Sequence, residues 1–149
     1  MATKPAAGGA YWAAASKTVT RSGRHFAQFT VVNCPGGMMF GVIRLGCDVE
    51  GGAGAYTVHG HCFYNMRDGK RYPGNIQGRD GWFGRQDAME QGDRVGMLLD
   101  LDQGSMTVWK NDVKLGVMVA EGLSGPFCWA VDLFRSSSAR IESAALPAQ

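Results

Sequence analysis

The sequence has no long apolar run, no large excess of charge of one sign and no closely spaced cysteine pair, and each absence excludes a class of protein. No stretch approaches the roughly 18 apolar residues of a membrane span, and residues 1–10 lack the apolar core of a secretory signal. The 15 Lys and Arg residues against 13 Asp and Glu leave a net charge of +2. Electrostatics alone therefore does not favour a nucleic-acid or membrane partner.

Cysteine usage indicates a reducing environment. The four cysteines have no C-x-x-C spacing, and no N-x-S/T acceptor sequence occurs. A chain of 149 residues can bury a real core without disulfide bridges. We therefore expect four free thiols and an intracellular protein, cytoplasmic or nuclear.

Glycine is abundant, with 22 residues, whereas proline occurs five times. Many glycines between short apolar runs indicate many turns and therefore many strands. The runs at 25–33, 38–45, 56–64, 127–134 and 139–143 are predicted strands, and residues 65–80 are a polar stretch. Residues 1–15 are rich in Ala and Gly and are predicted to be a flexible N-terminal tail, although Ala13–Ala15 could instead form one helical turn.

The clearest pattern lies in residues 92–119. Val95, Met97 and Leu99 alternate with residues of the other face, and the same period of two returns at 106–110 and 115–119. The turns between these runs are 102–104 and 111–112, where Asn and Asp tolerate a positive φ. These features predict a three-stranded antiparallel meander.

The predicted fold is all-β, with two antiparallel sheets packed face to face as a sandwich, because no long stretch has apolar residues at helical spacing. The expected domain covers residues 16–146, and residues 147–149 are a short C-terminal tail.

The meander also carries a family resemblance. Residues 92–117, G-D-R-V-G-M-L-L-D-L-D-Q-G-S-M-T-V-W-K-N-D-V-K-L-G-V, resemble the SPRY pattern G-D-x-[IV]-G-x-x-L-D-x-D-x-G-x-[IL]-x-F-x-x-N-G-x-x-L-G. Further similar segments are 23–26, 40–42, 60–61 and 122–133. The differences are Val108 followed by Trp109 at the usual aromatic position, Asn111-Asp112 in place of N-G, and a missing Trp after His25-Phe26.

The resemblance implies a compact sandwich that binds a protein or short peptide through its loops, as an adaptor or as a subunit of a larger multiprotein complex. It implies no catalytic centre, no metal and no cofactor. Carried over by position, the partner-binding residues would be Arg44, Tyr72, Phe134 and Arg135, grouped on one loop rim. Arginine and aromatic residues are enriched at binding hot spots, which agrees with this choice.

Three groups of residues could suggest chemistry, but each is better explained by a structural role. His59 and His61 share one face of a predicted strand, but a structural zinc site needs four ligands and no second pair lies at metal spacing. Asp100 and Asp102 are paired carboxylates, but they flank a predicted turn rather than a sugar-sized cleft. Residues 51–54, Gly-Gly-Ala-Gly, lack the Lys and spacing of a phosphate-binding loop.

Basic and aromatic residues alternate in residues 70–85, which can mark a nucleic-acid surface. Acidic residues at 68, 80 and 87 dilute the charge, so a solvated loop is the preferred interpretation. The competing functions are a carbohydrate-binding lectin-like sandwich, an enzyme, and a structural subunit or a fragment of a longer protein. The first two lack a supporting site in the sequence.

Overall fold

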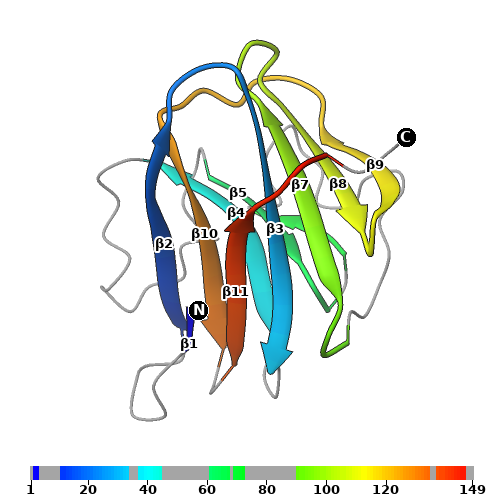
Figure 1. Ribbon diagram of the computed structural model, residues 1–149. Helices are drawn as coiled ribbons and strands as arrows, with labels where there is room; N and C mark the ends of the chain where they lie inside the picture. Colours follow the sequence, from blue (N-terminus) through cyan, green and yellow to red (C-terminus); the bar gives the residue numbers. More distant parts are fainter. Residues whose placement is uncertain are drawn as a thin grey trace.

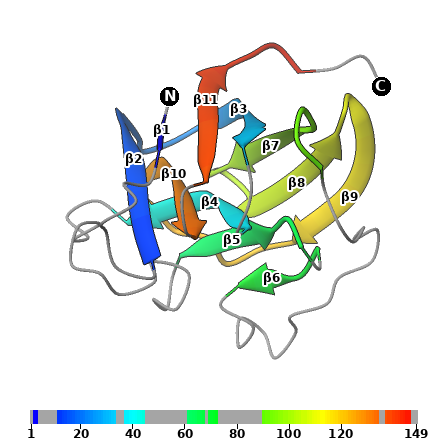
Figure 2. The same ribbon diagram turned by 90° about the horizontal axis from the view of Figure 1, so that it is seen from below.

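The computed structural model describes residues 2–3, 11–33, 37–44, 61–67, 69–72, 90–134 and 137–146, with the backbone alone at 2–3, 11–20, 134 and 143. Every regular element in these ranges is a strand, and the strands form two antiparallel sheets that face each other (Figures 1 and 2). The predicted fold class, an all-β two-sheet sandwich, is confirmed.

The six-stranded sheet has the order β1 (Ala2–Thr3), β11 (Ser138–Ser143), β3 (Arg24–Asn33), β7 (Arg94–Asp100), β8 (Ser105–Lys110) and β9 (Val113–Val119). The five-stranded sheet has the order β2 (Tyr11–Thr20), β10 (Phe127–Phe134), β4 (Met38–Arg44), β5 (Cys62–Asn65) and β6 (Arg71–Tyr72).

The central core lies between the two sheets and is built by alternation along each strand. On β7, Val95, Met97 and Leu99 have no exposed surface and belong to this core, as the sequence predicted. Phe29 of β3 meets Phe40 of β4 across the gap, with ring centroids 5.2 Å apart. Such aromatic contacts hold the two layers in a fixed register.

The β8–β9 turn is fixed by side chains as well as by backbone. Asn111 and Asp112 have φ values of +49° and +69°, as the predicted turn requires. Oδ1 of Asn111 accepts from the amide N–H of Arg94 at 2.9 Å, and its Nδ2 donates to Oδ1 of Asp93 at 3.0 Å. Asp112 forms an ion pair with Arg94 at 2.9 Å. This turn is therefore bound to the start of β7.

Asp93 is expected to make the stability of the protein depend on pH in acid. Burial alone would raise its pKa, but the Asn111 side chain, the Glu90 amide and the charge of Lys110 together hold it below 3.8. A carboxyl with a depressed pKa contributes stability above its unfolded pKa, and this contribution is lost as the pH falls through the folded value. Urea unfolding of the wild type and Asp93→Asn between pH 2 and 6, a range that spans roughly the unfolded value of about 3.9, should give curves that converge in acid. A constant difference between them would contradict this role.

The predicted flexible tail is corrected by the pairing of β1 and β2. Residues 11–15 belong to β2, whose backbone pairs antiparallel with β10, including Ala14 with Val131 and Ala15 with Ala130. Ala2 and Thr3 pair with β11. Alanine has low strand propensity, but an unfilled edge of a sheet offers hydrogen bonds that override this local preference.

Several strand bounds differ from the prediction, and one strand was not predicted. β3 begins one residue earlier, at Arg24, and β11 begins one residue earlier, at Ser138. β6 lies in the stretch that was expected to be polar and irregular. The predicted strand at 56–64 is described only from residue 61, and Leu45, the last residue of another predicted strand, also lies outside the described residues.

Candidate partner-binding surface

Arg44 is the last residue of β4, and its side chain is exposed. Its backbone pairs with Phe127, the first residue of β10. Arg44 therefore lies at the end of the sandwich where the segment 120–126 enters β10. The turns after β2 and after β7 lie at the same end (Figure 1).

The turns at this end are hydrogen-bonded to one another. The amide N–H of Leu101 donates to the carbonyl of Gly23 at 2.8 Å, and the amide of Gly23 donates to Oδ1 of Asp102 at 3.3 Å. The amide of Leu123 donates to the carbonyl of Gly104 at 3.0 Å. Turns linked in this way keep their shape. The binding of a partner therefore costs little conformational entropy in these turns.

The carboxylates of Asp100 and Asp102 accept hydrogen bonds from the backbone of the turns at this end. Oδ1 of Asp100 accepts from the amides of Asp102 at 3.0 Å and Gln103 at 3.1 Å, and its Oδ2 lies 3.7 Å from Nε of Arg24. Asp102 is itself an acceptor for Gly23. These contacts support the interpretation of both residues as turn chemistry.

Tyr72 ends β6, the edge strand of the five-stranded sheet, and its side chain is half-buried. It pairs with Phe63, which pairs with Gly41 of β4. Tyr72 therefore lies two strands from β4, level with a residue three positions before Arg44. With strands about 4.8 Å apart and about 3.3 Å per residue, the Cα atoms of Arg44 and Tyr72 are roughly 14 Å apart.

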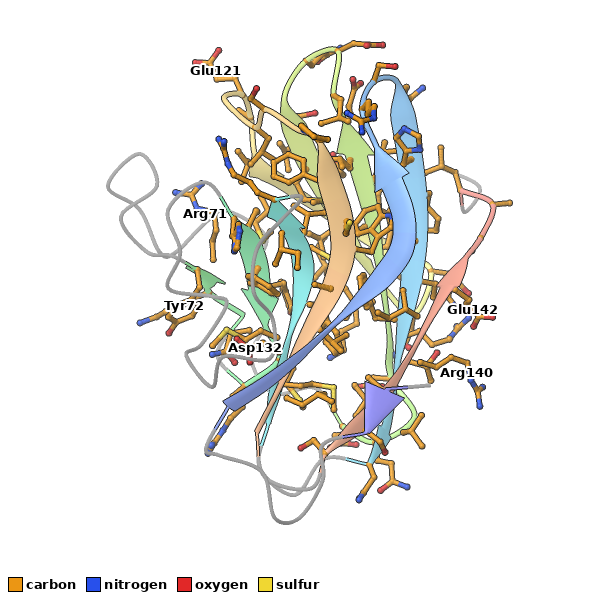
Figure 3. All side chains as sticks on the ribbon, turned by 90° about the vertical axis from the view of Figure 1, so that its left-hand side faces the viewer. Arg71, Tyr72, Glu121, Asp132, Arg140 and Glu142 are labelled. Carbon is orange, nitrogen blue, oxygen red and sulfur yellow. The ribbon has the colours of Figure 1, made fainter. Side chains whose placement is uncertain are left out.

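The residue before Tyr72 ties the edges of the two sheets together. The Arg71 side chain is 3% exposed, and its Nη1 donates to the carbonyl of Met118 on β9 at 3.1 Å (Figure 3). It also lies near Cys62. Burial raises the pKa of the Cys62 thiol to about 12, although the charge of Arg71 acts in the opposite direction. At neutral pH this thiol is therefore protonated and unreactive.

Phe134 lies at the other end of the sandwich. Phe134 is the last residue of β10, one position beyond Leu133, which pairs with Met38 at the start of β4. Seven residues of β10 separate the level of Phe134 from that of Arg44, or about 23 Å. Arg135 lies outside the described residues.

The structure thus places Arg44 at one end of the five-stranded sheet, Phe134 at the opposite end, and Tyr72 level with the middle of β4. Arg44, Tyr72 and Phe134 therefore do not lie together on the single loop rim expected from the sequence. The Arg44 end also carries exposed side chains that the sequence analysis did not select, among them Arg21, Arg24 and Glu121. Their position in turns that bound predicted strands was the available signal.

Other proposed sites are only partly covered. His61 is completely buried, and His59, the other histidine of the zinc alternative that the sequence did not favour, lies outside the described residues. Of the basic and aromatic stretch, Lys70, Arg71 and Tyr72 are described, and residues 73–89 are not. Within the described ranges, no three His, Cys, Asp or Glu side chains gather as metal ligands would. In the same ranges, no helix has the length and apolar character needed to cross a bilayer.

Comparison with known proteins gives a consistent result at the level of the fold. No family model matches the sequence, and no curated protein matches it either. Among solved structures, the SPRY domain of human HERC1 is similar with a TM-score of 0.65 and 17% identity, covering 95% of this chain and 87% of that one. A second human SPRY domain has a TM-score of 0.67 and 17% identity, covering 95% and 88%. The chain is therefore a SPRY-like domain in its fold.

Proposed function

We propose that the chain is a protein-interaction module without a catalytic centre of its own. It binds a protein or a short peptide and acts as an adaptor or as a subunit of a larger assembly. The SPRY-like fold supports this proposal, because recognition on a rigid β-sandwich is commonly carried by its loops.

The main support for the proposal is the arrangement of the turns at the Arg44 end of the sandwich. An exposed arginine lies at the same end as turns that are hydrogen-bonded to each other, so these turns are already ordered before a partner arrives. Arginine and tyrosine are both frequent binding hot spots. The proposed contact surface contains Arg44 and Tyr72.

The test compares four baits in a pull-down from native lysate. They are the wild type, Arg44→Ala/Tyr72→Ala, Phe134→Ala/Arg135→Ala, and the control Arg140→Ala/Glu142→Ala. The control removes two exposed side chains of β11, far from Arg71 and Tyr72 in Figure 3. Each bait is first shown to unfold cooperatively in urea.

A partner should bind the wild type and the control and be lost from Arg44→Ala/Tyr72→Ala. Removing one hot spot costs about 2 kcal/mol, or roughly a 30-fold weaker affinity. A partner lost only from Phe134→Ala/Arg135→Ala would place the surface at the opposite end. If a partner remains bound to every variant, neither end of the sandwich contains the contact surface.

A further inference from the structure

A second apolar cluster lies on the outer face of the six-stranded sheet. Leu98 and Trp109 are 7% and 2% exposed, yet neither belongs to the central core between the sheets. Their neighbours Met97 and Val108 do belong to it, so Leu98 and Trp109 point the other way. The outer face of a sheet in a two-layer sandwich normally faces water. Their burial therefore requires a cover.

Part of the cover is a half-buried aromatic ring. Phe26 of β3 meets the ring of Trp109 edge to face, with centroids 5.5 Å apart and planes at 88°. Its ring lies directly over Gly96, where an added Cβ would come within 3.0 Å of Cε2. Glycine at this position lets the ring lie flat against the backbone between the strands.

A lysine stem covers another part. Nζ of Lys114 on β9 lies 6.0 Å from the centre of the Trp109 ring. A lysine in this position buries its methylene groups on the ring and keeps its charge in water.

The segment after β11 crosses the rest. Residues 144–146 run from the end of β11 over the outer side of β3 and β7, and Figures 1 and 2 agree on this path. The segment reads Ala-Ala-Leu and has no charge. Leu146 is 39% exposed, so more than half of its surface is covered. An uncharged strap thus passes over the strands that carry Phe26 and Leu98.

We propose that the outer face of the six-stranded sheet is a docking surface for an extended, uncharged, apolar segment, and that the chain's own residues 144–146 occupy it. This docking surface is distinct from the Arg44 end and does not depend on the proposed function. It is centred on Leu98 and Trp109, with Phe26 and Lys114 packed beside Trp109. A segment of the same chemistry supplied by another molecule would compete with the strap for this surface.

The test uses the full chain and the indole N–H resonance of Trp109, assigned with Trp109→Phe. Leu146→Asp places a charge in the strap and should release it, so the Trp109 resonance should shift. Val113→Asp is the control, because Val113 is 65% exposed and lies on β9, away from the path of the strap. A peptide with the sequence of residues 143–149 is then added to Leu146→Asp, beside the same peptide with Asp at the Leu position.

The proposal predicts a shift in Leu146→Asp and none in Val113→Asp. The wild-type peptide should return the resonance toward its position in the unmodified chain, whereas the Asp peptide should not. An unchanged resonance in Leu146→Asp, or an equal shift in both variants, would overturn the strap as the cover. A shift that neither peptide reverses would contradict the proposal that the outer face is a docking surface.

Discussion

Gly41→Ala should destabilise the protein by about 3 kcal/mol or more, the upper range for overpacking. Gly41 of β4 lies between Phe63 of β5 and Ala130 of β10. A Cβ there would lie 2.8 Å from the carbonyl carbon of Cys62 and 2.9 Å from Cα of Phe63. The obstacle is strand backbone, which cannot rotate away. Alanine in a strand normally stabilises a protein by about 0.5–1 kcal/mol relative to glycine. The cost of the clash is larger than this gain, so the net effect is destabilising.

Gly96→Ala is the matched control for this prediction. Its added Cβ would also be crowded, but by the far end of the Phe26 ring rather than by backbone. A half-buried side chain can turn away, so the expected cost is about 1 kcal/mol. Urea unfolding of both variants tests the difference. Equal urea midpoints for the two variants would contradict this prediction. They would show that the backbone of β5 moves aside as readily as the Phe26 ring.

Arg71→Ala should have the second large effect, a loss of about 3 kcal/mol. The variant removes a charged donor from the carbonyl of Met118 and leaves a gap where the buried side chain lay. The hydrogen bond joins β6 and β9, which are the edge strands of the two sheets. Its loss should therefore loosen these edges before it affects β7 and β8.

Amide hydrogen exchange measures this loosening separately for each strand. In Arg71→Ala, the amides of β6 and β9 should exchange faster while those of β7 keep most of their protection. Tyr72→Ala is the neighbouring control, because that side chain is only half-buried, whereas Arg71 is 3% exposed. Uniformly faster exchange in all strands, or unchanged exchange in β9, would argue against the link between the two edges.

The meander was predictable because its signal is local. Val95, Met97 and Leu99 repeat with a period of two, and Asn111-Asp112 marks the turn, so the strands and the buried face follow from neighbouring residues. β2 was missed because Ala13–Ala15 give no strand signal of their own. That strand exists through its pairing with β10, more than 100 residues away in the chain.

The grouping of the site residues failed for a similar reason. Arg44 and Phe134 each lie at or next to the end of a predicted strand, and both were expected on one rim. The antiparallel pairing of β4 with β10 sends their last residues to opposite ends of the sheet. Strand direction and order are properties of the whole fold. The burial of Arg71 was equally hidden, because its neighbours in the sequence are those of an exposed basic loop.

Site-specific photo-crosslinking tests the central claim most directly. A photo-reactive phenylalanine analogue replaces Arg44 or Tyr72 in two baits and Arg140 in a third, and each bait is irradiated in native lysate. If Arg44 and Tyr72 lie on the partner-binding surface, the same protein should be crosslinked from both positions and not from Arg140. A protein crosslinked from position 140 alone, or equally from all three, would contradict it.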